Sequence, residues 1–328
     1  MPCYNEEAAV ARTVAGFAAA LPGADIYVYD NDSGDRTAEV AAAAGAIVRC
    51  ERMRGKGHVI RRMFADIEAD IYVIADGDAT YDPRSAPPMV EMLIRDRLDM
   101  VVAVRDSGSD GAYRPGHAIG NRLFTGLLGW LFGRSFNDVF SGYRVFSRRF
   151  VKSFPALSRG FEIETEISVH ALELAMPVAE LDSAYGARPE GSVSKLSTWR
   201  DGWRIFRTVA QLFRLERPVL FYGGFGLLLA AAAIVLAVPL AITYFETGLV
   251  PRLPTAVLVT GLMLLAFLSF FTGLILDTVV RGRRETRRLF YLGYRAPEER
   301  AARPLEAAPP SADVRDETII SIAGSRKP

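Results

Sequence analysis

Asp76 and Asp78 are the residues of this chain whose type and spacing most clearly predict chemistry. Gly77 separates them, and they follow residues 71–75, a short apolar run typical of a β-strand. Two carboxylates one residue apart at a strand end can hold a hard divalent cation that also binds the oxygens of a diphosphate. A nucleoside diphosphate bridged in this way becomes a better leaving group. Acidic turns also arise without function, so the pair needs support from its surroundings.

The elements that would position this pair alternate between strand and helix. Residues 26–29, 46–50 and 71–75 are predicted strands, and residues 37–44 and 58–67 are predicted helices. This alternation predicts a parallel α/β sheet with ligands at the carboxyl ends of its strands. Two further polar clusters, residues 2–7 and 30–37, are therefore expected on the same rim as Asp76.

Several other classes of site are not supported. No GxGxxG segment opens a helix and no GxxxxGK[ST] segment occurs, so a nucleotide site must be built in another way. Cys3 and Cys50 lack the spacing of a disulfide scaffold or a zinc site. The formal net charge of +1 argues against a nucleic-acid-binding protein.

Ordered motifs give the chain a family resemblance that extends from Met1 to about Arg214. They are residues 2–7 (PCYNEE), the acidic segment 30–37, Gly55-Lys56-Gly57, Asp76-Gly77-Asp78, residues 141–146 (SGYRVF) and residues 191–196 (GSVSKL). With these motifs the chain resembles family 2 glycosyltransferases of the GT-A fold, specifically the polyprenyl-phosphate type that includes dolichol-phosphate mannose synthase. In that family the first strand precedes the segment that matches Pro2.

The resemblance implies an inverting enzyme that moves a hexose from a UDP- or GDP-linked sugar to a polyprenyl phosphate, with Mg²⁺ or Mn²⁺ as cofactor. Asp76 would contact donor and metal, and Asp78 would be the principal metal ligand. Thr80 stands where related synthases often carry Gln. The base and ribose site would be lined by Pro2, Tyr4, Glu6 and Asp30.

Further cations and one carboxylate are assigned in the same way. Arg105 matches an arginine near the donor phosphates, and Arg188 and Lys195 match a pair that closes over the diphosphate or the lipid phosphate. Asp138 falls where relatives place a carboxylate that faces the acceptor, so it either orients the acceptor, acts as a base or is a helix or turn cap. Arg114 and Asn121 either guide the lipid phosphate or belong to a solvated loop and a helix cap.

A short acidic segment is less specific. Glu162, Glu164 and Glu166 are predicted to lie on a helix near the acceptor site, where one or two of them would orient arginines; metal ligation is the alternative. His170 is predicted to be structural.

Two uncharged runs near the C-terminus, residues 219–243 and 255–276, are long enough to cross about 30 Å of hydrocarbon at 1.5 Å per residue. They predict a transmembrane hairpin; the alternative is a pair of buried core helices. Arginines cluster outside the two runs, so the positive-inside rule places both flanks, the catalytic domain and both termini in the cytoplasm of a multi-pass inner-membrane protein. These arginines are 204, 207, 214 and 217 before the hairpin, and 281, 283, 284, 287 and 288 after it.

The predicted domain division is a GT-A domain (1–198), an amphipathic helix (199–217), the hairpin (218–280) and a basic, then disordered, tail (281–328). Trp199, Trp203 and Phe206 alternate with arginines at helical spacing, so this helix either lies in the membrane interface or packs on its own domain.

Two other functions stay open at this point. A membrane glycosyltransferase that acts on a glycan or polysaccharide would use the same donor motifs, although processive synthases normally carry a QxxRW signature that is absent here. A catalytically inactive nucleotide-binding membrane protein is the alternative from another class. The motifs name neither the sugar nor the oligomeric state, and a homo-oligomer stays open.

Overall fold

The computed structural model describes residues 1–106, 126, 129–130, 136–160, 162–186, 210–211 and 213–297. Most of the predicted amphipathic helix, the motif at 191–196 and the predicted disordered segment lie outside these residues.

The first part of the N-terminal α/β domain contains a parallel sheet of β1 (Pro2–Cys3), β2 (Tyr27–Asp30) and β3 (Ile47–Cys50), in the order β1-β2-β3. Helices α1 (Val10–Ala20) and α2 (Thr37–Ala43) connect these strands. Residues 2–3, in the polar cluster 2–7, form a short strand whose pairing with β2 is extended by Met1. The Met1 amino group donates to Tyr27 O over 2.7 Å, and Tyr29 N donates to Met1 O over 2.9 Å.

The second sheet has the order β4-β6-β5-β7, formed by β4 (Ile71–Ile74), β6 (Arg144–Ser147), β5 (Met100–Asp106) and β7 (Val178–Ala184). β5 and β7 are parallel, but β6 runs antiparallel to β4 and β5. The predicted parallel arrangement is therefore confirmed for β1-β2-β3, whereas β6 makes the second sheet mixed. The chain enters β6 at the carboxyl end of β4, where Arg144 pairs with Ile74, and must run back. This reversal brings residues 138–142 to the rim that carries Asp76.

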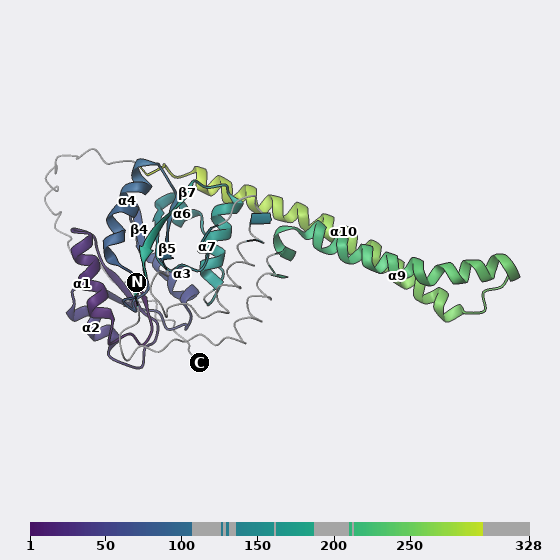
Figure 1. Cartoon of the computed structure of the whole chain (residues 1–328), viewed down its shortest axis with the longest axis horizontal. Coiled ribbons are helices and arrows are strands. Elements are labelled where there is room, and N and C mark those ends of the chain that lie inside the picture. Colours follow the sequence, from purple (N-terminus) through teal and green to yellow (C-terminus); the bar gives the residue numbers. More distant parts are fainter. Residues whose placement is uncertain are drawn as a thin grey trace, which may run out of the picture. The chain divides into compact units, whose positions relative to one another are not determined.

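Helices cover both faces of the sheets, which gives three layers (Figure 1). One face packs against α1, α2 and α4 (Ala86–Arg95), which follows the short 3₁₀ helix η1 (Pro83–Ser85). The other packs against α3 (Lys56–Asp66), α6 (Arg148–Ser153) and α7 (Glu162–Glu173). The α/β fold is thus confirmed, with its apolar core divided between the two faces.

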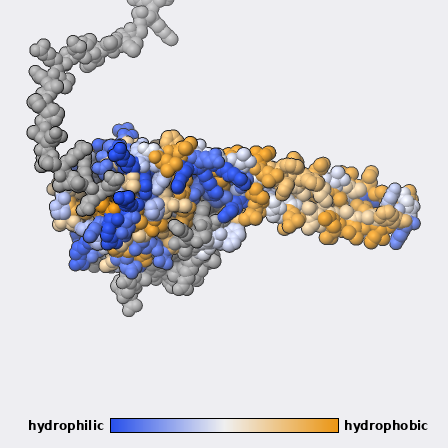
Figure 2. Space-filling model, turned by 90° about the horizontal axis from the view of Figure 1, so that it is seen from above, coloured by the Kyte–Doolittle hydropathy of each residue, from blue (hydrophilic) through white to orange (hydrophobic). Residues whose placement is uncertain are grey.

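Two long apolar helices follow: α9 (Pro218–Thr247) and α10 (Leu253–Leu292). Their most apolar windows have mean hydropathies of 2.7 and 2.3, and 11% of each window is buried. Such low burial argues against the core-helix alternative, and Figure 2 shows a largely hydrophobic surface over this hairpin. By length and composition both helices can cross a membrane.

The end of α10 differs from the predicted domain division. The boundary was placed at residue 280, but the helix continues through the arginine-rich segment to Leu292. The physical reason is that this segment contains no Pro or Gly after Gly282, and its arginines meet buried carboxylates of the catalytic domain.

Candidate active site

The turn Asp76-Gly77-Asp78 directly follows β4 and packs against the end of β1. A Cβ atom on Gly77 would overlap Cys3 Sγ, so this approach requires a glycine. Thr13 Oγ1 on α1 also donates to Gly77 O over 3.2 Å. Burial raises the pKa of the Cys3 thiol to about 12, so this side chain stays neutral beside the carboxylates.

The loops at residues 2–7 and 30–37 are joined by hydrogen bonds, as their shared rim predicted. Asn5 donates from its backbone N to Ser33 Oγ over 2.9 Å, and its Oδ1 accepts from Gly34 N over 2.8 Å. Glu6 N donates to Thr37 Oγ1 over 2.9 Å. Asn5 has φ 52°, in the left-handed region that Asn tolerates better than most residues. The two loops therefore form one polar wall beside Asp76.

Asp30 contributes a carboxylate oxygen that can receive a ligand. The residue is 7% exposed, and its Oδ2 accepts from Ser33 N over 3.2 Å. Its Oδ1 is buried and has no hydrogen-bond partner among the described residues. A buried acceptor of this kind is costly unless a donor reaches it, so a ligand that offers a hydrogen-bond donor would be favoured here.

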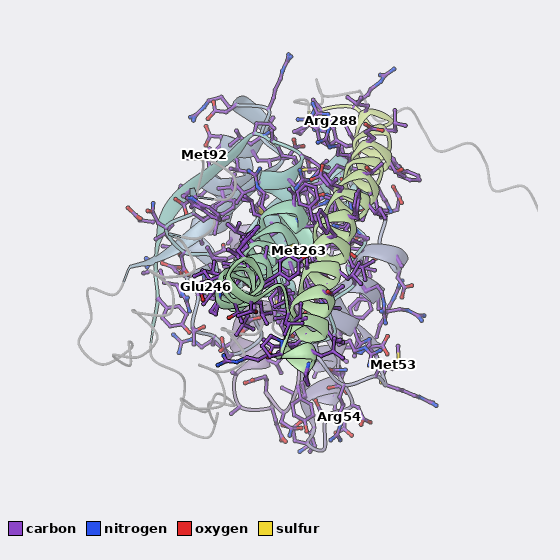
Figure 3. All side chains as sticks on the ribbon, turned by 90° about the vertical axis from the view of Figure 1, so that its right-hand side faces the viewer. Met53, Arg54, Met92, Glu246, Met263 and Arg288 are labelled. Atoms are coloured by element: carbon purple, nitrogen blue, oxygen red, sulfur yellow. The ribbon has the colours of Figure 1, made fainter. Side chains whose placement is uncertain are left out.

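The loop at residues 51–55, which follows β3, lies beside Asn31 at the candidate site. The sequence analysis did not assign this loop to the site. Asn31, which is 5% exposed, binds that loop through Glu51 O, Met53 O and Gly55 N, at 2.8, 2.8 and 2.7 Å. Arg54, at the edge of the molecule in Figure 3, lies 5.4 Å over the Tyr4 ring. Arg54 is held there by Asp32.

Lys56 is the cation at the centre of the site. Its Nζ lies 2.5 Å from Asp76 Oδ1 and 2.6 Å from Glu164 Oε1, and its side chain is 7% exposed. Burial by itself would lower the pKa of Lys56, but the carboxylates of Asp76 and Glu164 outweigh burial and raise it. Lys56 therefore stays charged, and it fixes one oxygen of Asp76.

Lys56 lies between two glycines, Gly55 and Gly57, that allow another backbone segment to approach closely. This close approach explains why both neighbours of Lys56 are glycines. A Cβ on either glycine would overlap the backbone carbonyls of residues 158–159, which lie directly against them. Gly142 covers the other side, where an added Cβ would lie 2.5 Å from Asp76 Oδ2. The motif matched a family pattern in the sequence, but its lysine was not among the predicted site residues. One or two of Glu162, Glu164 and Glu166 were expected to orient arginines, and Glu164 binds this lysine.

Asp78 is 4% exposed, and its Oδ1 accepts from Thr80 N and Thr80 Oγ1 over 3.2 and 2.6 Å. In the part of the chain that the structure describes, no group of three or more His, Cys, Asp or Glu converges for a metal. Asp76 and Asp78 nevertheless supply hard oxygen donors, which fit a cation such as Mg²⁺ that keeps water and phosphate oxygens as its remaining ligands.

Arg105 and Asp138 form a bidentate ion pair. Arg105 Nε donates to Asp138 Oδ2 over 2.6 Å, and a terminal nitrogen donates to Oδ1 over 2.8 Å. Asn137, which precedes Asp138, binds Glu180 through its backbone and side chain over 2.7 Å each. The sequence assigned Arg105 to the donor side and Asp138 to the acceptor side. The structure shows both carboxylate oxygens of Asp138 engaged by this arginine.

The remaining sequence-based assignments divide into two groups. Arg114, Asn121, Arg188 and Lys195 lie outside the described residues. His170 lies in the core, where its Nε2 is 3.1 Å from Ser153 Oγ and burial lowers its pKa to about 3. This location agrees with the structural role predicted for it.

Comparison with known proteins identifies the family. The model of glycosyl transferase family 2 matches residues 1–154. An uncharacterized protein of Shigella flexneri is 55% identical over 154 residues, which are 47% of this chain and 94% of that protein. The chain belongs to glycosyl transferase family 2.

More distant relatives agree with this assignment. A dolichyl-phosphate hexose transferase of Haloferax volcanii is 26% identical to this glycosyltransferase over 218 residues, 66% of this chain and 93% of that protein. Glucosyl-3-phosphoglycerate synthase of Mycobacterium tuberculosis, solved with Mn²⁺, UDP and glucosyl-3-phosphoglycerate, superimposes with a TM-score of 0.54 at 22% identity. The match covers 65% of this chain and 76% of that structure, and it shows the shared GT-A fold.

Proposed function

We propose that this family 2 glycosyltransferase transfers a hexose, with inversion, from a UDP- or GDP-linked sugar to a polyprenyl phosphate at the cytoplasmic face of the inner membrane. The observation that carries the proposal is the packing of Gly77 against Cys3. It joins the carboxylate turn to the loops at residues 2–7 and 30–37, on a chain that also has two apolar helices of spanning length.

The donor would lie along this rim. Pro2, Tyr4, Glu6 and Asp30 are proposed to bind the base and ribose, and the unpartnered oxygen of Asp30 suits a ribose hydroxyl. Asp76 and Asp78 would hold Mg²⁺ or Mn²⁺. Such an ion, when bound, neutralises charge on the departing diphosphate.

The acceptor side requires little proton transfer. A lipid phosphate is already anionic near neutral pH, so its oxygen can attack the anomeric carbon without a strong base. Because Arg105 engages both oxygens of Asp138, the geometry favours Asp138 as the residue that holds Arg105 toward a phosphate. From the family resemblance, Arg114 is proposed to guide the lipid phosphate, and Arg188 and Lys195 to bind the diphosphate or the lipid phosphate.

The acceptor class is supported by the two apolar helices and by the relative named as a dolichyl-phosphate hexose transferase. The test is full-length protein in liposomes with a polyprenyl phosphate, Mg²⁺ or Mn²⁺, and labelled UDP-glucose or GDP-mannose. Label in the lipid fraction, lost in Asp78→Asn, is the expected result. Label that enters only added glycan would favour the polysaccharide alternative, and nucleotide binding without any transfer would favour the inactive one.

A further inference from the structure

The buried residues of α10 recur on one side of the helix. Its buried residues include Ala266, Gly273 and Val280, and Arg287 continues the same spacing of seven residues. Positions seven apart lie on nearly the same side of an α-helix. The side of α10 that is buried among the apolar residues therefore continues into the arginine-rich end.

In the apolar half this face packs closely on α9, and the two helices lie side by side in Figure 1. A Cβ on Gly226 would lie 2.8 Å from Ala266 O, and a Cβ on Gly273 would lie 3.2 Å from Pro218 O. Ser269 Oγ donates to Tyr222 O over 2.7 Å. Small residues at these positions let the helix backbones approach, which makes the hairpin one unit.

The arginine-rich end of α10 binds two buried carboxylates. Arg284 contacts Glu173 Oε1 at 3.3 Å and Glu216 Oε2 at 2.6 Å, and Arg287 contacts Glu173 Oε2 at 2.6 Å. The side chains of Glu173 and Glu216 are 0% and 5% exposed. Buried ion pairs with several partners have a defined geometry, unlike exposed pairs.

A third contact fixes the last turn of the helix. Tyr291 is 7% exposed, belongs to the core of the catalytic domain, and donates to Asp99 Oδ2 over 2.8 Å. Its ring lies under the guanidinium groups of Arg149 and Arg288, at 4.9 and 5.1 Å. Arg288 projects from this end of α10 in Figure 3 and also donates to Leu174 O. We call Glu173, Glu216, Arg284, Arg287 and Tyr291 together the α10 clamp.

The clamp is connected to the candidate active site through α7. Glu173 is the last residue of α7, and Glu164, near its start, binds Lys56. At 1.5 Å per residue, about 13 Å of one helix separates the two carboxylates. The same short helix thus contacts the site at one end and, at the other, the continuation of an apolar helix that is long enough to cross a membrane.

We propose that Glu173 is a positioning residue that, through Arg284 and Arg287, holds the catalytic domain at a fixed height and orientation on α10. This inference rests on the proposed function, because a fixed position matters only when the acceptor lies in the membrane. Arg284 and Arg287 are among the flanking arginines from which the positive-inside rule assigned a cytoplasmic location. In this proposal they bind the protein itself rather than lipid headgroups.

The experiment compares two acceptors for full-length protein in liposomes: a long-chain polyprenyl phosphate in the bilayer and geranyl phosphate added to the solution. In Glu173→Gln we expect kcat/KM for the bilayer acceptor to fall by about 10- to 100-fold, as misplaced reactants do. For the soluble acceptor and for nucleotide binding we expect a change of less than about twofold. Glu285→Gln, on an exposed position of the same helical segment, is the matched control.

A second variant keeps the inference testable if Glu173→Gln misfolds. Arg287→Gln breaks the pair from α10 and leaves the catalytic domain unchanged, so nucleotide binding should persist while bilayer transfer falls. Trypsin provides a readout without any substrate, because an opened clamp should expose Arg284 in both variants, and Arg287 in Glu173→Gln, and speed cleavage there.

The outcomes separate the two proposals. Wild-type protein that transfers to neither acceptor refutes the proposed function and the positioning role with it. Wild-type transfer, with both variants losing activity equally on the two acceptors, refutes the positioning role alone. Unchanged bilayer transfer in a variant whose clamp is open to trypsin also refutes it. Selective loss with the bilayer acceptor supports it.

Discussion

Replacing Lys56 with Met tests the charge arrangement at the centre of the site. The change leaves Glu164, whose side chain is 11% exposed, without its cation, and Asp76, whose side chain is 30% exposed, with one free oxygen. Removing one partner of a buried ion pair costs about 3–5 kcal/mol. Because Asp76 is partly solvated, we expect the lower end, a loss of about 3 kcal/mol in the free energy of unfolding.

The sign of the pH dependence follows from the same geometry. Without Lys56, burial should raise the folded-state pKa of Glu164 above its unfolded value. The folded variant then holds a proton that the unfolded chain has lost, so its stability falls as pH rises. The loss in the free energy of unfolding of Lys56→Met, relative to wild type, should therefore be largest near pH 8 and decrease toward pH 5.

The assay is thermal or chemical unfolding of full-length protein in detergent with EDTA, for Lys56→Met, Glu164→Gln and the double variant. The double variant removes both charges, so it should be more stable than the sum of the single effects by at least about 1 kcal/mol. A Lys56→Met deficit below about 1 kcal/mol, or purely additive effects, would refute the assignment of Lys56 as a buried charge held by Glu164.

Three further predictions concern other parts of the domain. Gly77→Ala should destabilise the protein by about 1–3 kcal/mol, because the added Cβ overlaps Cys3, whereas Gly34→Ala, with open space around it, should change the unfolding midpoint little. The pKa of His170 is about 3 in the folded protein and near 6.5 when unfolded, so stability should fall as pH drops from about 6.5 toward 3, by roughly 1.4 kcal/mol per pH unit. His170→Asn should flatten that slope in pH-dependent unfolding, and an unchanged slope would contradict the assignment. Asp138→Asn should abolish transfer in the liposome assay and spare nucleotide binding measured by calorimetry; full activity would contradict its role.

The local pattern of the sequence was enough for the fold class and for one half of the site. The alternation of apolar runs and helical stretches predicted the strands and helices between residues 26 and 75. Their predicted first and last residues lie within two residues of those in the structure. Strand ends in an α/β sheet share a rim, so residues 2–7, 30–37 and 76–78 could be placed together before any contact was known. The apolar runs that form α9 and α10 were equally evident, because spanning length is a local property.

The antiparallel direction of β6 could not be predicted in this way. The direction of a strand depends on the end of the sheet at which the chain enters it, and the local sequence does not encode that. Its effect is to bring Gly142 over Asp76 and to place Asp138 beside Arg105. The role of Lys56 was missed for a related reason. Its partners, Asp76 and Glu164, lie 20 and 108 residues away along the chain.

The Asp76-Gly77-Asp78 turn, its strand, and the length and apolarity of the two C-terminal helices were determined by the sequence alone, because residue type, spacing and hydropathy act over a few neighbours. Which oxygen of Asp76 is held by a lysine, which arginine engages Asp138, and where α10 binds the catalytic domain were decided only by the tertiary structure. Each of these depends on charges from distant segments that meet in a buried place, where an unpaired charge is costly and the partner is set by packing.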